Sequence, residues 1–116
     1  MSGVAQASER PEAESARDLE SARRVFRLEA EGIQSLARAL EGPLGAALTR
    51  AIDLIRGAGG RVIVTGMGKN SHVARKVAAT MASVGTPAQF VHPAEASHGD
   101  LGMIARNDAV IALSNS

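Results

Sequence analysis

Short polar segments after apolar runs carry the side chains of this chain that could do chemistry. The first, residues 66–72 (GMGKNSH), combines two glycines with Lys69. A tight turn between a strand and a helix exposes backbone N–H groups, and the helix dipole adds positive charge there. We expect this loop to hold the phosphate or carboxylate of a small molecule beside Lys69, although glycines also occur in such turns for steric reasons alone.

A second polar segment, residues 92–102, contains two of the three histidines of the chain. His92, Glu95 and His98 have a spacing that could suit a first-row metal ion, but three sparse ligands on a loop are a weak signal. His98 could equally satisfy backbone groups of the loop. The segment therefore adds imidazole and carboxylate groups without fixing their use.

The chain closes on a third polar segment, Ser114-Asn115-Ser116. Its two hydroxyl groups could bind phosphate oxygens. They could also cap a helix that follows, because serine is a favoured capping residue. Both interpretations stay open from these residues alone.

Two familiar nucleotide-binding loops do not match residues 61–72. A Walker phosphate loop would need glycine where Ile63 stands and a hydroxyl residue where Asn70 stands. A dinucleotide-binding turn would need a third glycine at the position of Ser71. Nucleotide hydrolysis is therefore unexpected, and dinucleotide binding is disfavoured.

The composition narrows the class of protein. A chain of 116 residues forms one domain at most, and a net charge of +1 with two aromatic residues gives no case for nucleic acid binding. The absence of cysteine excludes disulfides and thiolate zinc sites. No apolar stretch is long enough for a transmembrane helix, and no signal peptide is evident, so we expect a cytoplasmic protein without membrane partners.

The first half of the chain predicts helices. Residues 1–14 are polar and read as a disordered lead, followed by a domain over residues 15–116. Residues 16–40 carry an apolar seam with a seven-residue repeat, which could pack on its own domain or on a neighbouring subunit. Residues 44–56 form a second amphipathic pattern, so the two segments predict a helical hairpin.

The second half alternates strands and helices. Apolar runs at 61–65, 88–92 and 109–113 predict strands, and residues 70–84 and 94–97 predict helices between them. This rhythm indicates an α/β fold with a parallel sheet, in which the polar segments gather at the carboxyl ends of the strands. Because the third strand ends without a following helix, we expect a fragment that is truncated after about three strands.

Residues 66–104 resemble the D-arabinose 5-phosphate isomerase family, most specifically in the block GTPAQFVHPAEASHGDLGM, and so does the closing ALSNS. Enzymes of this family carry a sugar isomerase (SIS) domain. The resemblance implies a doubly wound parallel sheet of flavodoxin-like strand order. It also implies interconversion of D-ribulose 5-phosphate and D-arabinose 5-phosphate through an enediol, which supplies the Kdo sugar of lipopolysaccharide. Members are cytosolic homotetramers that require no cofactor.

The resemblance also implies site residues. Lys69 matches the lysine implicated in catalysis, and His92 matches a zinc-contacting position as well as a substrate-contacting one. Together with the loop residues, the predicted substrate-binding set is Gly66, Gly68, Asn70, Ser71, Gly85, Thr86, His92, His98, Ser114 and Ser116. Gly85 and Thr86 lie at the wrong end of the sheet for this site unless they reach it across a subunit interface.

Two departures from the family pattern matter. Asn70-Ser71 stands where the family has Ser-Gly, and we expect the loop shape to survive because asparagine caps helices and tolerates unusual φ angles. The later catalytic residues of the family are absent, so we expect the fragment alone to be inactive. The alternative function is a sugar-phosphate-binding regulatory module of the SIS type, which the absence of a basic recognition helix disfavours.

Overall fold

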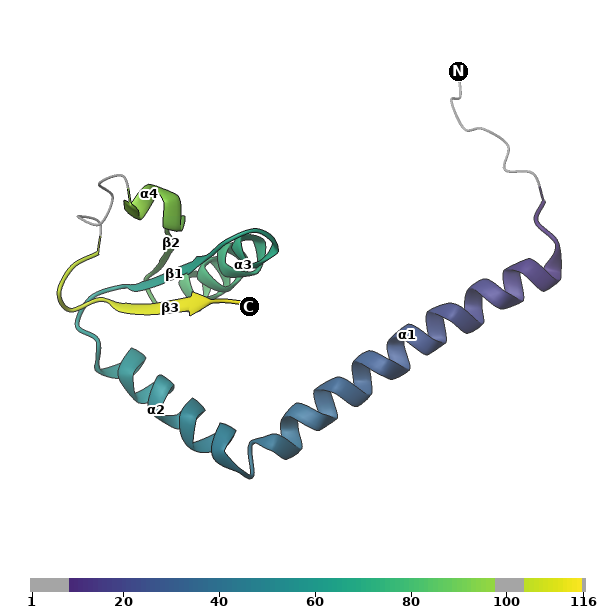
Figure 1. Cartoon of the computed structure of the whole chain (residues 1–116), viewed down its shortest axis with the longest axis horizontal. Helices are drawn as coiled ribbons and strands as arrows, with labels where there is room; N and C mark the ends of the chain where they lie inside the picture. Colours follow the sequence, from purple (N-terminus) through teal and green to yellow (C-terminus); the bar gives the residue numbers. More distant parts are fainter. Residues whose placement is uncertain (1–8, 98–103, 116) are drawn as a thin grey trace, which may run out of the picture. The chain divides into compact units, whose positions relative to one another are not determined.

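The computed structural model describes residues 9–97 and 104–115 (Figure 1). In chain order the elements are α1 (Glu12–Ala39), α2 (Pro43–Gly57), β1 (Val62–Gly66), α3 (Lys69–Ser83), β2 (Ala88–Phe90), α4 (Pro93–Ser97) and β3 (Ala109–Leu113). The chain divides into two compact units, residues 1–46 and 47–116. Among the described residues, no helix is long and apolar enough to cross a membrane.

The first unit is dominated by α1, which begins at Glu12 rather than at residue 16. The earlier start has a local cause, since Glu12 and Glu14 place negative charge in the first turn of the helix. No residue of α1 is buried, and the seam side chains Leu19 and Phe26 are 60% and 73% exposed. The apolar seam therefore has no partner among the described residues of its own unit, 9–46.

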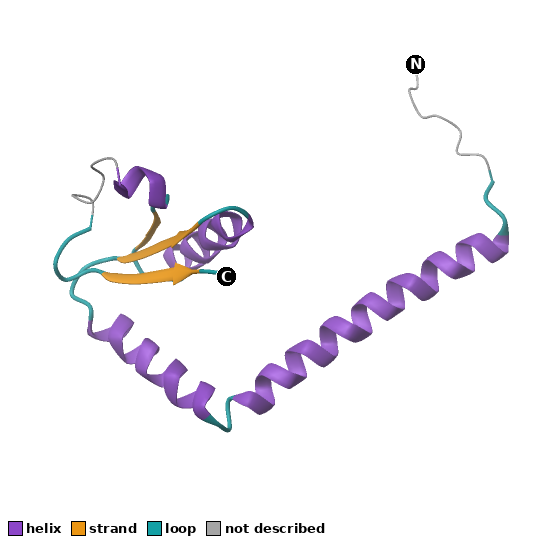
Figure 2. Ribbon diagram, in the orientation of Figure 1, coloured by secondary structure: helices purple, strands orange, loops and turns teal. Residues whose placement is uncertain are grey.

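The second unit contains a parallel three-stranded sheet in the order β2-β1-β3, with α3 beside it (Figure 2). This order confirms the predicted fold class. In register, Val64 pairs with Phe90 on one side and Ile111 on the other. The carboxyl ends of the three strands consequently share one edge of the sheet.

The strands match the sequence-based bounds closely, with small shifts that have physical causes. β1 begins at Val62, one residue later than expected, and the N–H of the preceding Arg61 donates to the Asp108 carboxylate. β2 ends at Phe90, two residues earlier than expected, and the chain turns at His92 to enter α4. β3 has the predicted bounds.

Burial differs between the central and outer strands. Val62, Ile63 and Val64 are at most 2% exposed, so β1 is buried on both faces of the sheet. β3 instead alternates, and its Val110 is 53% exposed. This strand has a continuous apolar sequence, but it lies at the outside of the sheet and only its α3-facing side chains, including Ile111, join the core.

Small side chains let α3 lie close to the sheet. Ala74 is fully buried and Ala78 is 5% exposed, and both pack against Val62 and Val64. The small side chains of Ala74 and Ala78 thus allow the close packing of α3 on β1. Because β1 and α3 are joined by the glycine loop, this contact fixes the position of the loop.

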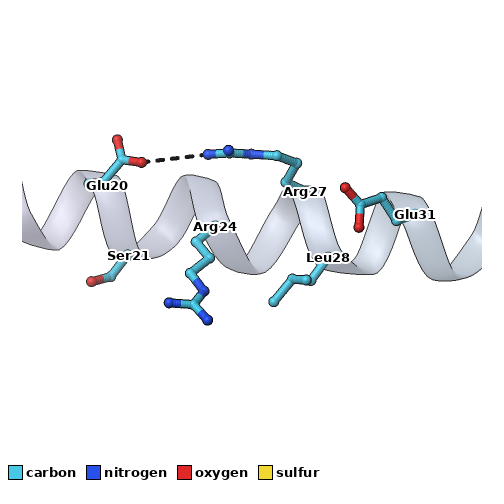
Figure 3. Close-up of a pocket in the computed structure, with 6 residues that line it drawn as sticks. All are labelled: Glu20, Ser21, Arg24, Arg27, Leu28 and Glu31. Carbon is cyan, nitrogen blue, oxygen red and sulfur yellow. Dashed lines mark ion pairs between the residues drawn. The ribbon is translucent and has the colours of Figure 1, made fainter.

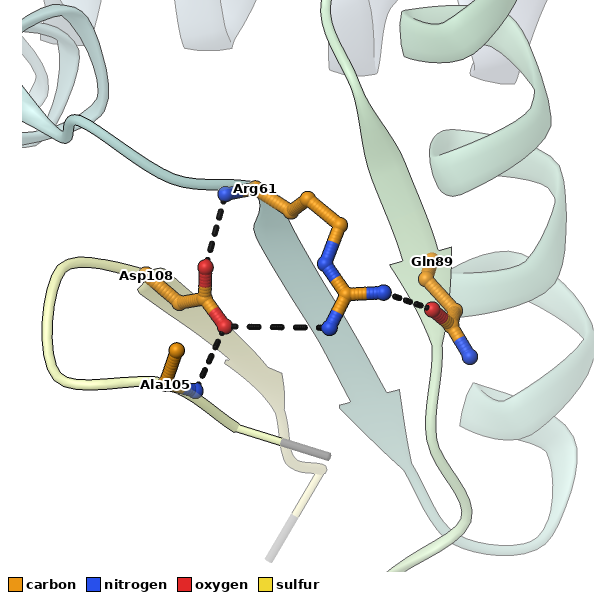
Figure 4. Close-up of polar contacts among 4 residues, drawn as sticks. All are labelled: Arg61, Gln89, Ala105 and Asp108. Atoms are coloured by element: carbon orange, nitrogen blue, oxygen red, sulfur yellow. Dashed lines mark hydrogen bonds and ion pairs between the residues drawn. The ribbon is translucent and has the colours of Figure 1, made fainter. Parts of the chain in front are cut away.

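An ionic cluster joins the three strands at the opposite, amino edge of the sheet (Figure 4). The Asp108 carboxylate accepts hydrogen bonds of 2.7 Å from the backbone N–H groups of Arg61 and Ala105, and its side chain is 2% exposed. The Arg61 guanidinium lies 4.0 Å from Asp108 and donates to the side chain of Gln89 in β2. Hydrogen bonds from Ala105 and Arg61 lower the pKa of Asp108 from its ordinary value of 3.8.

We expect Asp108→Asn to lower the Tm at pH 7 by roughly 5 °C, since the amide cannot accept both backbone hydrogen bonds as the carboxylate does. Because folding lowers the pKa of Asp108, its carboxylate stabilises the folded state at pH values above the pKa that the group has in the unfolded chain. That stabilisation is lost as the pH falls through the pKa of Asp108 in the folded state. Melting curves between pH 7 and pH 2 should therefore converge for the two proteins at low pH. Asp53→Asn, on the exposed surface of α2, is the matched control.

Candidate functional site

The loop from β1 to α3 has a shape that depends on its two glycines. A side chain at Gly66 would place a Cβ atom 2.9 Å from the carbonyl oxygen of Asn70, which no real Cβ tolerates. Gly68 precedes α3 with φ 60° and ψ −132°, a conformation that residues with a Cβ atom rarely adopt. These constraints bring the backbone of the loop close to the first turn of α3.

The two residues that depart from the family pattern, Asn70 and Ser71, make hydrogen bonds within the turn. Asn70 does not cap α3 and has no unusual φ, because Gly68 is the N-cap and no described residue other than glycine has a positive φ. Asn70 lies inside the first turn, where its N–H donates to Met67. The Ser71 hydroxyl donates to the carbonyl oxygen of Gly68 at 2.6 Å and so ties the turn to the helix.

Lys69 is the first residue of α3 and His72 lies in the same turn, and both are exposed. No acidic residue lies in this first turn. The positive end of the helix dipole and the lysine ammonium group therefore act in the same direction. This arrangement suits an anionic ligand at the loop.

His92 lies where the chain passes from β2 to α4 and is half-buried. Its Nδ1 accepts a hydrogen bond of 3.1 Å from the N–H of Ala94, and its carbonyl oxygen accepts one from Ala96. The imidazole therefore acts as the side-chain cap of α4. In the neutral ring the proton then resides on Nε2, which makes Nε2 a donor toward a ligand.

The third segment lies next to the glycine loop. Leu113, the last residue of β3, pairs in register with Gly66, the last residue of β1. Ser114 follows Leu113 directly and is exposed. The structure therefore places Ser114 beside the loop that carries Lys69.

Not every predicted residue joins this edge. Gly85 and Thr86 follow α3 and precede β2, so they lie at the amino edge of the sheet, where the N–H of Val62 donates to the neighbouring Pro87. This agrees with the expectation that they could not reach the site within one chain. His98 and Ser116 lie outside the described residues.

The suggested zinc ion at His92 has no support among the residues that the structure describes. Within residues 9–97 and 104–115, no group of three or more His, Cys, Asp or Glu side chains could hold a metal ion. A histidine that binds a metal through one nitrogen normally donates a proton from the other. The Nδ1 of His92 instead accepts a hydrogen bond from the backbone N–H of Ala94, which leaves Nε2 as the hydrogen-bond donor.

Two hollows are lined by residues other than those predicted for the site. The first, of about 460 Å³, is lined by six residues of α1 alone, and Figure 3 shows that its walls are side chains of a single helix. An exposed ion pair of 3.5 Å between Glu20 and Arg27 crosses it. The second, of about 820 Å³, lies between the end of α2 and the start of β3 and includes Leu54 and Val110. Neither contains a residue of the carboxyl edge.

One feature of this edge was missed by the sequence reasoning. The Arg75 guanidinium on α3 lies 4.1 Å from the centre of the Phe90 ring, and this ring lies against His92 with a centre-to-centre distance of 6.3 Å. The available signal was the position of Phe90, one of two aromatic residues in the chain, at the end of a strand and two residues before His92.

We expect Gly68→Ala to destabilise the chain by about 1–3 kcal/mol, because alanine would be strained at φ 60°. The matched control is Gly32→Ala on α1, where an added Cβ would meet nothing within 4 Å. That control should stabilise its helix slightly, by roughly 0.5–1 kcal/mol. Urea unfolding of both variants measures the two effects, and equal stabilities would show that the turn does not need this conformation.

The family model described as "SIS domain" matches residues 54–116. The arabinose 5-phosphate isomerase KdsD of Pseudomonas aeruginosa is 51% identical over 98 residues, which cover 84% of this chain and 29% of that protein. The chain thus spans less than a third of the length of this curated relative.

Two solved structures are also similar to this chain. An E. coli CFT073 protein in complex with A5P has a TM-score of 0.61 and 41% identity, covering 81% of this chain and 52% of that chain. A candidate phosphosugar isomerase of Bacteroides fragilis involved in capsule formation has a TM-score of 0.61 and 36% identity, covering 79% of this chain and 50% of that chain.

Proposed function

The chain belongs to the SIS domain family, and from this premise we propose that it builds part of the site of a sugar-phosphate isomerase. The reaction is the interconversion of D-ribulose 5-phosphate and D-arabinose 5-phosphate. The observation that carries the proposal is the gathering of Lys69, His92 and Ser114 at the carboxyl edge of one parallel sheet. The similar E. coli protein bound to A5P, which we take as arabinose 5-phosphate, supports the choice of ligand.

The proposed chemistry moves a proton between C1 and C2 of the sugar. A base removes a proton from C1 of the ketose, a proton returns to C2, and the C2 carbonyl oxygen gains a proton while O1 loses one. Negative charge develops on oxygen in the enediolate, and a cation or donor held in place stabilises it. We assign this role to Lys69, whose ammonium group is carried by the first turn of α3.

The remaining residues of the edge bind the substrate. Gly66, Gly68, Asn70 and Ser71 form the wall around Lys69, and Ser114 offers a hydroxyl to the phosphate. His92 offers Nε2–H to a sugar oxygen, in keeping with the hydrogen bond at its Nδ1. The proposal includes a cytoplasmic homotetramer, in which Gly85 and Thr86 reach the site of a neighbouring subunit, and it requires no cofactor.

An NMR titration of the chain with D-arabinose 5-phosphate tests the binding part of this proposal. Amide signals of residues 66–72, 91–96 and 114–115 should shift, whereas signals around Leu54 and Val110 should not. D-Arabinose without phosphate is the control and should cause much smaller shifts. Unchanged spectra, or shifts confined to other surfaces, would contradict the proposed site.

A regulatory module that binds the sugar phosphate without turning it over is the second candidate function. A chimera distinguishes the two: the present chain replaces the segment that it matches in the P. aeruginosa isomerase, where the two are 51% identical. We expect this chimera to isomerise D-ribulose 5-phosphate. A folded chimera that binds the sugar phosphate but has no activity would favour the regulatory function.

A further inference from the structure

Three side chains from neighbouring elements form a continuous stack at the carboxyl edge, and none of the assigned roles requires Arg75 or Phe90. Arg75 belongs to α3, Phe90 ends β2, and His92 precedes α4. Figure 1 shows α3 and β2 side by side, with α4 directly after β2. We call this set the Arg75–Phe90–His92 stack.

Phe90 is held from two directions. Its side chain is half-buried and packs against the core cluster that contains Val64 and Ala74. The Arg75 guanidinium lies over the ring at 4.1 Å from its centre, within the range of a cation–π interaction. Arg75 has no ion pair with a carboxylate in residues 9–97 and 104–115, so the aromatic ring is its principal described contact.

The fixed Phe90 ring in turn restricts His92. The two rings lie 6.3 Å apart with an interplanar angle of 77°, a favourable perpendicular arrangement. The N–H of Ala94 holds Nδ1 of the same imidazole at 3.1 Å. Because Phe90 and the N–H of Ala94 both hold the His92 ring, the direction of its other nitrogen, Nε2, is defined.

We propose that Arg75 and Phe90 are positioning residues that set the direction of the His92 Nε2–H donor toward a sugar oxygen. This inference rests on the proposed function. A donor that is already oriented stabilises developing charge without reorganising during the reaction. Loss of the stack should therefore lower kcat more than it raises KM.

The first test follows the His92 ring in the chain itself, independently of activity. NMR cross-relaxation signals should connect ring protons of His92 with those of Phe90, and the Ala94 amide proton should show its hydrogen bond to Nδ1. Arg75→Gln should weaken the signals between the rings, and Phe90→Leu should shift the Ala94 amide proton. Lys76→Gln, the exposed neighbour on α3, should change neither. Unchanged ring signals in Arg75→Gln would overturn the inference.

The second test measures turnover in the chimera. Arg75→Gln should lower kcat by about 2- to 5-fold, as expected for one exposed cation–π contact, with KM nearly unchanged. Phe90→Leu should lower it by about 10-fold, since both ring contacts are lost. Arg75→Lys and Phe90→Tyr keep a cation and a ring, and both should recover most of the activity.

The outcomes separate this inference from the proposed function. An active chimera in which Arg75→Gln has the same kcat as Lys76→Gln would overturn the positioning role alone. An inactive, folded chimera would contradict the isomerase function, while the ring signals would still report on the stack. If Phe90→Leu lowers the Tm strongly, Arg75→Gln and Phe90→Tyr carry the decision, because Arg75 is exposed and tyrosine keeps the ring.

Discussion

Lys69→Ala is expected to lower the kcat of the chimera by roughly 100- to 1,000-fold, the usual effect of removing one group that stabilises an oxyanion. The lysine is exposed in the first turn of α3, where the dipole already favours negative charge. Alanine removes the ammonium group but leaves the glycine loop unchanged. The melting temperature should therefore stay within about 2 °C of the parent, because exposed helix positions tolerate alanine.

The matched control is Lys76→Ala, which removes the same charge from the same helix about two turns further on. Its kcat should remain near that of the unsubstituted chimera. An NMR titration of both variants with D-arabinose 5-phosphate shows whether Lys69 acts in binding or in turnover. Near-normal kcat in Lys69→Ala would remove the lysine from the mechanism.

Ala74→Leu should lower the free energy of unfolding by about 1–3 kcal/mol. Ala74 is fully buried between α3 and β1, so a larger side chain forces the helix away from Val62 and Val64. The Tm should fall by roughly 5 to 20 °C for a chain of this size. Because α3 carries Lys69, ligand binding should weaken as well.

Ala79→Leu is the control, since Ala79 lies on the exposed side of the same helix. Leucine is a good helix former, so this variant should melt within a few degrees of the parent. Circular dichroism melting of the two variants measures the difference. Equal melting temperatures would show that the close approach of α3 to the sheet does not stabilise this unit.

The sequence was sufficient for the arrangement of the second unit. The apolar run at β1 predicted a central strand, and Val62, Ile63 and Val64 are indeed buried. The strand–helix–strand rhythm predicted a parallel sheet, and the order β2-β1-β3 agrees with the flavodoxin-like order that the family resemblance implied. These strands could be predicted because each is a short apolar run bounded by polar or glycine-rich segments.

The sequence was insufficient where contacts join distant residues. The Asp108 carboxylate accepts a hydrogen bond from the N–H of Arg61, which lies 47 positions earlier in the chain. Local sequence patterns do not indicate such a pair. The capping role of the His92 ring depends on the exact turn from β2 into α4, which apolar periodicity does not specify. The N-cap of α3 is Gly68 with φ 60°, so the capping ability of Asn70, on which the expected loop shape was argued, is not used.

The initial rate at which the chimera converts D-ribulose 5-phosphate into D-arabinose 5-phosphate tests the central claim most directly. The unaltered P. aeruginosa isomerase and the Lys69→Ala chimera are measured in parallel. We expect the chimera to turn over the substrate and the Lys69→Ala variant to be nearly inactive. A folded chimera with no turnover beside an active P. aeruginosa enzyme would contradict the account.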